Sequence, residues 1–277
     1  MKQILRLSRP MRDSLSSATY LFAIIGTVAS IAGISIGGFL PDLPIWLLTI
    51  LTLAVYLSLA AAIRLSLFLR TKTGIQLKVN GNTVDIRAGD LFSCNGWKVI
   101  PFNEYYDTTV DNITISKTSL NGLFIENHVG NLEDLSFAIA NDTQTSMSPP
   151  RRSEAEKLQY ELGTLKRYKG EYLLLAFSHF NSLNEAHLTM AEYEQCLINL
   201  WREVNRVYSG IAVYVPLLGS GVTRFDNSGW SPSKQDLLKC MICTLRTSKA
   251  VFSAPITIIL TEKAMEEINL YDLRGWF

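Results

Sequence analysis

Two long uncharged stretches of apolar residues stand at the start of the chain. The first runs from Ser14 to Pro41 and the second from Ile45 to Ile63. Nineteen helical residues span roughly 28 Å, which matches the hydrocarbon thickness of a bilayer. The first stretch is too long for the core of a signal peptide, and the second follows it at once. The pattern predicts a transmembrane hairpin with spans at about 17–40 and 45–69.

From about residue 73 the apolar positions follow the shorter periods of a water-soluble domain. Asn80-Gly81 is a strong hairpin turn signal between two predicted strands. Farther on, strands alternate with helices, which is typical of a largely parallel sheet covered on both faces. The predicted strands are Ile75–Val79, Thr83–Arg87, Trp97–Phe102, Tyr172–Ser178, Ile211–Leu217 and Pro255–Leu260, and the predicted helices are Met190–Tyr208, Ser233–Ser248 and Glu262–Ile268.

These patterns divide the chain into a hairpin at 1–72 and one α/β domain at 73–277. Only a few residues around Thr71–Gly74 connect the two parts. Within the domain, the polar and Pro-containing segment 141–153 is expected to be an exposed loop, and Ser153–Lys157 the start of a helix.

Charge separates the same two parts. Residues 1–72 hold seven basic and two acidic side chains, whereas the rest of the chain holds 19 basic and 23 acidic ones. A mildly acidic domain lacks the clustered Lys and Arg that displace counterions from nucleic acid, so we expect no nucleic-acid partner. Basic residues flank the two spans, and the turn between them offers only Asp42. The positive-inside rule therefore predicts a multi-pass protein of the cell inner membrane with both termini in the cytoplasm.

Small residues form a stripe along the first span. Gly26, Ser30, Gly33 and Gly37 recur at helical spacing on one face. Such faces let helices approach closely in lipid. Packing against the second span and self-association between subunits explain the stripe equally well.

The four cysteines, Cys94, Cys196, Cys240 and Cys243, form no regular framework, which suits reduced thiols in a cytosol. Cys240 and Cys243 make a lone C-x-x-C, whereas a zinc site needs about four ligands. We therefore predict no metal site and interpret this pair as the packing face of a helix.

Few other side chains suggest chemistry. His179 ends a predicted strand and faces either a ligand or its own structural partners, and the structural use is the commoner. Glu104 and Asp107 fit acid–base groups, but a solvated loop explains them more simply. The three histidines and the serines show no spacing that identifies a nucleophile.

The clearest binding motif follows the strand Ile211–Leu217. It reads Leu-Gly-Ser-Gly-Val-Thr-Arg-Phe from Leu218, and its glycines permit close approach of main-chain N–H groups to a phosphate. Ser220 and Thr223 add hydroxyl donors, and Arg224 adds a positive charge. In parallel sheets, ligands bind beyond the carboxyl ends of the strands. Taken alone, the motif also fits an ordinary tight turn, which is the commoner use of such a sequence.

Three segments together resemble macro domains, the ADP-ribose-binding α/β/α modules. The Gly-Ser-Gly segment resembles their second phosphate-binding loop. Ala88–Phe92 resembles the Gly-Asp-Ile element whose Asp contacts adenine, and Val99–Asn103 resembles the strand that delivers an Asn toward the ribose. The resemblance covers residues 75–277 and implies a macro-like three-layer α/β/α domain with a mixed sheet. The ligand-binding residues that it implies are Asp90, Leu91, Phe92, Asn103, Gly219, Ser220, Gly221, Val222, Thr223, Arg224 and Phe225.

One departure from the macro-domain pattern bears on catalysis. Hydrolytic macro domains follow the Asn-bearing strand with a catalytic loop rich in Asn and Gly. Here the chain reads Asn103–Thr108 and later Asn121–Ile125, with no triple-Gly stretch. The departure favours a binding-only branch, so we expect no catalytic residues and no enzyme activity.

Two membrane spans followed by a divergent macro domain resemble the ThsA-type effectors of type II Thoeris anti-phage defence. In that family a partner TIR-domain enzyme consumes NAD and makes an ADP-ribose-derived signal, histidine-ADP-ribose. The macro domain binds the signal, the effector oligomerises and the membrane is disrupted, which leads to cell death. The resemblance implies this nucleotide ligand, no further cofactor, and membrane lipid as a contact. Two alternatives stay open, a membrane-tethered ADP-ribosyl hydrolase and a reader of ADP-ribosylated protein.

The charge pattern yields a prediction of topology. A reporter fused after Phe277 is expected to be active in the cytoplasm, and a tag inserted at Asp42 should be labelled from outside the membrane. Protease protection in spheroplasts measures both. A reporter at Phe277 that is active only in the periplasm would contradict the predicted orientation.

Overall fold

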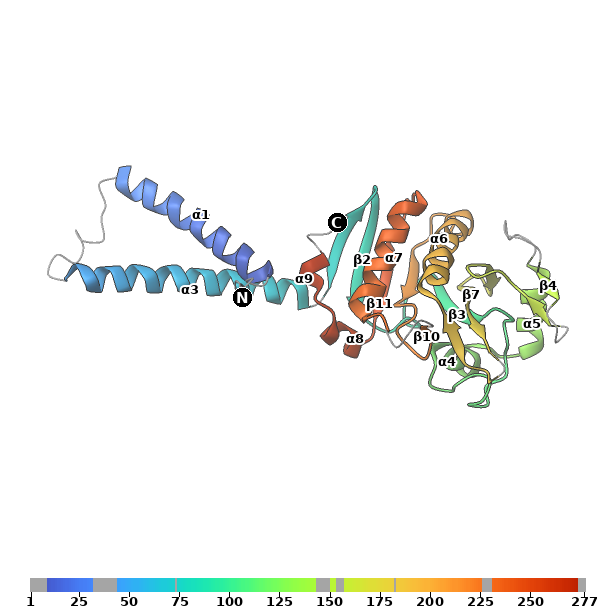
Figure 1. Cartoon of the computed structure of the whole chain (residues 1–277). Helices are drawn as coiled ribbons and strands as arrows, with labels where there is room; N and C mark the ends of the chain where they lie inside the picture. The colour runs from blue at the N-terminus through green and yellow to red at the C-terminus, as the bar shows by residue number, and fades with distance from the viewer. Residues whose placement is uncertain are drawn as a thin grey trace. The chain divides into compact units, whose positions relative to one another are not determined.

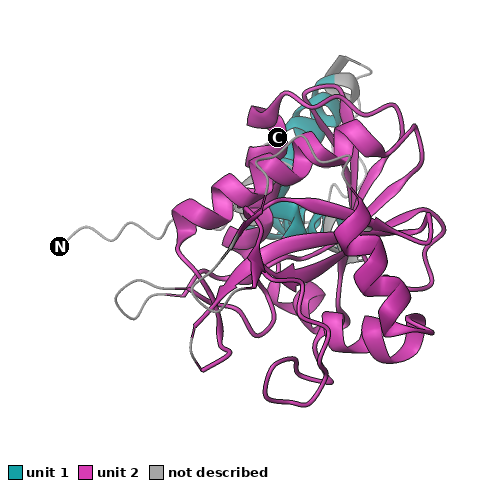
Figure 2. Ribbon diagram, turned by 90° about the vertical axis from the view of Figure 1, so that its right-hand side faces the viewer, with its two compact units in different colours: residues 1–74, 270–276 teal, residues 75–269, 277 magenta. Residues whose placement is uncertain are grey.

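The computed structural model describes residues 9–31, 44–72, 74–142, 150–152, 157–181, 183–225 and 231–273. They form two compact units, with boundaries after Gly74 and after Asn269 (Figure 2). The first unit holds α1 (Arg9–Ile31), α3 (Ile45–Lys72) and α9 (Leu270–Leu273). The sequence placed a single boundary at 72/73 and assigned all that follows to one domain. In the structure α9 packs against α1 and α3 and belongs to the first unit.

α3 is a continuous helix of 28 residues. Its segment Ile45–Ser66 is long and apolar enough to cross a membrane by length and composition. In α1 the apolar stretch among the described residues is Ser14–Thr27, which is shorter than a span. Residues 32–43, which include the end of the predicted first span and the predicted turn, lie outside the described residues. One candidate span is therefore observed, and the two-span hairpin stays a prediction.

A polar contact joins α1 to α3. The hydroxyl of Tyr56 lies 2.9 Å from Oγ1 of Thr19, and the Tyr56 ring meets Phe22 edge-on with centroids 5.8 Å apart. Such hydrogen bonds help to hold helices together in lipid, where water does not compete for them. At Gly26, by contrast, an added Cβ would meet no atom within 4 Å. Gly26 therefore does not serve close packing between α1 and α3; Gly33 and Gly37 lie outside the described residues.

The second unit is built on a mixed sheet with nine strands among the described residues (Figure 1). The strand order is β1-β2-β11-β9-β3-β7-β8-β10, and β6 also pairs with β7. Neighbours from β2 through β7 run parallel, whereas β1, β6 and β8 pair antiparallel with β2, β7 and β7. The bounds are β1 Ile75–Val79, β2 Asn82–Ala88, β3 Trp97–Asn103, β6 Leu165–Tyr168, β7 Tyr172–Phe180, β8 Ala186–Leu188, β9 Val213–Pro216, β10 Arg224–Phe225 and β11 Ile256–Leu260.

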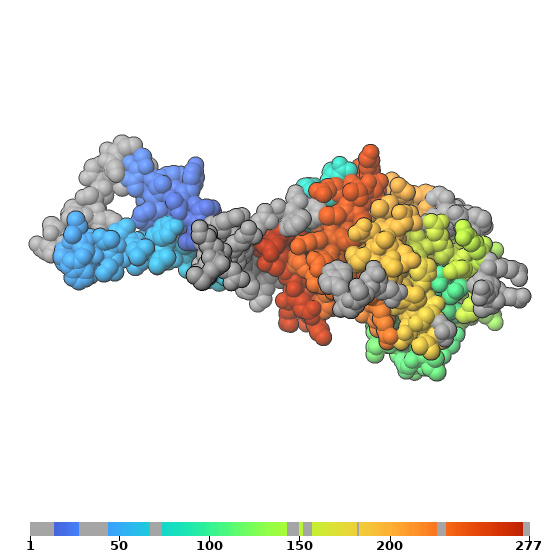
Figure 3. All heavy atoms as spheres, in the orientation of Figure 1, coloured from blue at the N-terminus to red at the C-terminus, as the bar shows by residue number. Residues whose placement is uncertain are grey.

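Helices cover both faces of this sheet. Phe102 of β3 meets Phe124 of α4 at a centroid distance of 6.1 Å, whereas Phe177 of β7 meets Tyr193 of α6 at 6.0 Å. α4 and α5 pack on one face through a cluster that includes Leu135, and α6 and α7 pack together on the other, where Figure 3 shows them side by side. The predicted three-layer α/β/α architecture with a mixed sheet is confirmed. The helices are α4 Leu120–His128, α5 Leu132–Asn141, α6 Met190–Val207, α7 Lys234–Ser248 and α8 Glu262–Glu267.

The six predicted strands and the helices predicted at Met190–Tyr208, Ser233–Ser248 and Glu262–Ile268 all appear, and the sequence missed shorter elements. It missed α4 because a glycine and four polar residues leave few apolar positions in this short helix, although Ser119 caps the helix by accepting the N–H of Gly122. Segment 141–153 is not a loop throughout: α5 extends to Asn141, and Arg151–Arg152 is a short strand, β4, paired with β5 (Leu158–Gln159). Most of the helix expected at Ser153–Lys157 lies outside the described residues.

A carboxylate–imidazole pair fastens the end of β3 to β7 and α6. Oε2 of Glu104, a buried side chain, lies 2.6 Å from Nδ1 of His179 and accepts from Gln159 at 2.7 Å. Nε2 of His179 lies 3.4 Å from Glu192, the capping-box residue of α6. The hydrogen bond with Glu104 raises the pKa of His179, although burial opposes it. Burial alone would raise the pKa of Glu104, but hydrogen bonds from His179 and Gln159 lower it on balance. His179 thus has structural partners.

This pair predicts a pH-dependent effect of His179→Gln. Because the folded-state pKa of His179 lies above 6.5, its charge stabilises the fold fully below pH 6.5, and this contribution is lost as pH rises through the folded value. The lowered pKa of Glu104 makes its own contribution complete above pH 4.5 and lost as pH falls through the folded value. The unfolding temperature in detergent should therefore differ most between wild type and His179→Gln from pH 4.5 to pH 6.5. The difference should become smaller at alkaline pH. In a Glu104→Gln background the pH dependence should become weaker, and only the smaller contribution from Glu192 should remain. A difference that is the same at every pH in the wild-type background would contradict the assignment.

Candidate functional site

A cavity of about 790 Å³ opens where the parallel strands end. β3 and β9 pair only at Trp97 and Lys98, and their ends beyond these residues are not joined. Both strands carry a proline toward the carboxyl end, Pro101 and Pro216, and proline has no N–H to donate to a neighbouring strand. The cavity lies at this opening, and its volume falls in the range of small-molecule sites.

Ten of the eleven predicted ligand-binding residues line this cavity. They are Asp90, Leu91, Phe92, Asn103, Gly219, Ser220, Gly221, Val222, Thr223 and Arg224. Phe225 is not among the lining residues. Its ring packs edge-on against Tyr193 of α6 at 5.6 Å and supports the loop from outside the cavity. The parallel topology thus gathers the three predicted segments at one edge of the sheet.

The two glycines of the loop after β9 have different roles. Gly219 has φ of +79°, where side chains are strained, and an added Cβ would lie 3.0 Å from the ring of Phe225. At Gly221 an added Cβ would meet no atom within 4 Å. Ser220 closes the turn by donating its hydroxyl to the carbonyl of Leu217 at 2.6 Å. The main-chain N–H groups of residues 221–223 donate to no described residue, which leaves them available to an anion.

Asp90 and Asn103 are both held by their own loops. Oδ1 of Asp90 accepts the N–H of Phe92 at 3.0 Å, while Oδ2 has no described partner. The side chain of Asn103 is more fully engaged: its oxygen accepts the N–H groups of Tyr105 and Asp107 at 3.1 Å each, and its nitrogen donates to Asp107 at 2.8 Å. Asn103 therefore has one amide N–H left for a ligand, whereas Asp90 keeps a carboxylate oxygen.

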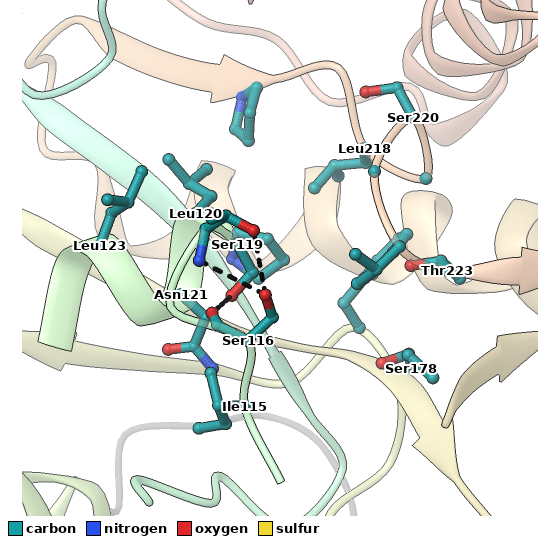
Figure 4. Close-up of a pocket in the computed structure, with 18 of the residues that line it drawn as sticks. Ile115, Ser116, Ser119, Leu120, Asn121, Leu123, Ser178, Leu218, Ser220 and Thr223 are labelled. Carbon is teal, nitrogen blue, oxygen red and sulfur yellow. Dashed lines mark hydrogen bonds between the residues drawn. The ribbon is translucent and has the colours of Figure 1, made fainter. Parts of the chain in front are cut away.

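The sequence missed one wall of the cavity, the segment from Asn112 to Leu123 that precedes and begins α4. Figure 4 shows Ser116 and Ser119 of this wall across the cavity from Leu218 and Thr223. The carboxylate of Asp111 shapes the segment by accepting the N–H groups of residues 113 and 114. The sequence offers one local signal for this wall, the helix cap at Ser119. The position of the wall could not be predicted, because the place of a loop depends on the strands around it.

Three basic side chains line the cavity. Nη1 of Arg224 lies 2.5 Å from Glu185, and Nζ of Lys234 lies 2.8 Å from Glu267. Lys263, at the start of α8, forms no ion pair with a described residue. A ligand phosphate near Arg224 would therefore compete with Glu185 for the guanidinium, whereas Lys263 is available without such competition.

The remaining candidate groups lie away from this cavity. Glu104 and Asp107 are not among the lining residues, and Asp107 pairs with Lys157 at 2.8 Å. Cys240 and Cys243 lie on α7, where burial raises the pKa of Cys240 to about 12. Among the described residues, no cluster of three or more His, Cys, Asp or Glu side chains is placed to hold a metal ion.

Comparisons with known proteins agree on one family. A family profile described as "Thoeris protein ThsA, Macro domain" matches residues 84–261. Thoeris protein ThsA of Bacillus amyloliquefaciens (strain Y2) is 35% identical over 236 residues, which cover 82% of this chain and 78% of that protein.

Solved structures similar to this chain include two mutants of the Oceanobacillus iheyensis macrodomain, one of them with ADPR. They share 13% and 14% identity, with TM-scores of 0.45 and 0.46. The alignments cover 74% of this chain in each case, and 93% and 97% of those chains. The profile match and the 35% identical relative show that this chain belongs to the Thoeris ThsA family and carries its macro domain.

Proposed function

We propose that this protein is a membrane-bound effector of Thoeris anti-phage defence whose macro domain binds an ADP-ribose-derived signal. The observation that carries the proposal is that three predicted binding segments line one cavity at the carboxyl ends of the parallel strands. This cavity brings together the Asp90 loop, the end of β3 and the Gly219–Arg224 loop, which are far apart in the sequence. Family membership supports the same ligand class.

The proposed binding mode assigns one ligand group to each loop. The diphosphate lies on the Gly219–Thr223 loop, where the N–H groups of residues 221–223 are available as donors. Oδ2 of Asp90 accepts from the adenine amine. The distal ribose extends between Asn103 and the wall that begins at Asn112. The assignments of the diphosphate and of the adenine amine each match a donor to an acceptor, which a buried polar ligand requires.

We further propose that the macro domain binds its ligand without catalysis. The carboxylates nearest to the end of β3 are engaged elsewhere: Glu104 with His179 and Asp107 with Lys157 and Asn103. A general base must reach the proton that it abstracts. The membrane-tethered hydrolase and the reader of ADP-ribosylated protein remain the alternatives, and turnover of ADP-ribosylated protein by the purified chain would identify the hydrolase.

The proposed mechanism of defence follows the family. A partner TIR-domain enzyme consumes NAD and supplies the signal, histidine-ADP-ribose, and binding drives oligomerisation and membrane disruption that kills the infected cell. A ligand shifts such an equilibrium only by its higher affinity for the assembled state. The apolar helix α3 supports a position in the inner membrane, with both termini in the cytoplasm. The open face of α1 at Gly26 supports association between the hairpins of different subunits.

The binding mode predicts the effect of Gly221→Glu. Open space around Gly221 lets the new side chain fold into the cavity, where its charge opposes the diphosphate. Calorimetry with ADP-ribose on the detergent-solubilised chain should show affinity lower by about two orders of magnitude, a loss of roughly 2.7 kcal/mol. Gly221→Gln adds similar bulk without charge and so separates the two effects on affinity. Gly130→Glu adds the same charge at another open glycine, outside the cavity, and should bind ADP-ribose with wild-type affinity. Unchanged affinity in a folded Gly221→Glu protein would refute the assignment.

The assembly mechanism predicts the effect of Gly26→Leu. A leucine there has room within one hairpin but blocks close approach of a second helix. Particle size in detergent should increase with the signal for wild type and not for Gly26→Leu, while ligand affinity stays equal. Ala54→Leu adds similar bulk to an exposed position of α3 and serves as the control. The mechanism fails if the signal leaves the particle size of wild type unchanged.

A further inference from the structure

The C-terminal segment begins in the cavity and ends among the hairpin helices. Thr261 and Lys263 line the cavity at the start of α8. Three residues after α8 ends, α9 belongs to the first unit and packs against α1 and α3. Its side chains Leu270 and Leu273 are buried. The chain from Thr261 to Leu273 is thus a covalent route of 13 residues from the binding site to the hairpin unit.

α7 holds the middle of this segment. Oε1 of Gln235 accepts the N–H of Asn269 at 2.7 Å, and its Nε2 donates to the carbonyl of the same residue at 3.4 Å. One residue earlier, Lys234 pairs with Glu267 at 2.8 Å and also lines the cavity. The first turn of α7 therefore fixes the last residue before α9 while reaching into the cavity.

The segment from Thr261 to Ile268 is anchored by a helix cap and by two buried side chains. Thr261 caps α8 by accepting the N–H of Ala264 at 3.2 Å, and the side chains of Ala264 and Ile268 are buried. A short element with buried side chains moves as a body, because each displacement has to repack its neighbours. The cap and the two buried side chains therefore hold the stretch between the cavity and Asn269 in place.

The other connection between the units is a poorer route. It enters the domain at β1, the edge strand of the sheet, and no residue of β1 lines the cavity. Gly74, at this connection, has φ of +138°, which favours glycine.

We propose that the segment Thr261–Leu273 transmits ligand binding to the hairpin unit and that Gln235 is the positioning residue that couples its two halves. The inference rests on the proposed function, since it requires a ligand in this cavity. A ligand that contacts the start of α8 fixes the segment, and Gln235 carries this restraint across Asn269 to α9.

Hydrogen–deuterium exchange of the full chain in detergent, with and without saturating ADP-ribose, tests the inference. In wild type, ADP-ribose should slow exchange at least twofold in 262–273 and should change exchange in α3. Gln235→Leu should bind ADP-ribose within about twofold of wild type, yet lose the ligand-dependent change in 270–273. Gln235→Glu retains the acceptor for Asn269 and should keep most of the change. Gln195→Leu removes a similar side-chain hydrogen bond on α6 and should behave as wild type.

Three outcomes would overturn the inference. ADP-ribose binding without altered exchange in 270–273 of wild type would refute transmission and leave the proposed function standing. Loss of ADP-ribose binding in Gln235→Leu would make Gln235 part of the binding site instead. Failure of wild type to bind ADP-ribose, measured by calorimetry on the same sample, would overturn both proposals.

Discussion

The parallel alignment of β2, β11, β9 and β3 is the constraint on which the site depends. Parallel strands end at one edge of the sheet, so the loops that follow them are brought together whatever their separation in the chain. The opening at that edge arises because β3 and β9 pair only near Trp97 and Lys98. Pro101 and Pro216 lack the N–H groups with which the two strands would continue to pair. The cavity is therefore a consequence of strand order and of two missing donors.

Hydrogen bonds within the loops then decide which groups remain available to a ligand. Asn103 is largely engaged with Asp107, and Ser220 closes its own turn, although both line the cavity. Asp90 keeps one carboxylate oxygen, and residues 221–223 keep their N–H groups. The loops after β2 and β9 thus present a carboxylate oxygen of Asp90 and the main-chain donors of residues 221–223, an arrangement that suits the adenine amine and the diphosphate of a nucleotide.

Because α9 belongs to the hairpin unit, the chain offers a second way in which ligand binding in the macro domain can affect that unit. With only the connection at Gly74, a domain can act on the hairpin by changing its local concentration. α9 adds a second connection that starts at cavity residues and is fixed by Gln235 at Asn269. Two covalent connections restrict how the units move, and a ligand at α8 acts on one of them directly.

The sequence by itself determined the apolar helix α3 and the strand–helix alternation, because a long uncharged run and a period of 2 or 3.6 are local signals. The glycines after β9 are also a local signal, for the Gly219–Arg224 loop, whereas the Asp90 loop and the end of β3 were expected from their resemblance to macro-domain segments. The tertiary structure alone decided that Asn112–Leu123 forms the opposite wall and that His179 faces Glu104 rather than the cavity. It also decided that Phe225 packs against Tyr193 outside the cavity lining and that α9 joins the hairpin helices. These features depend on contacts between residues far apart in the chain, whose energies no local pattern records.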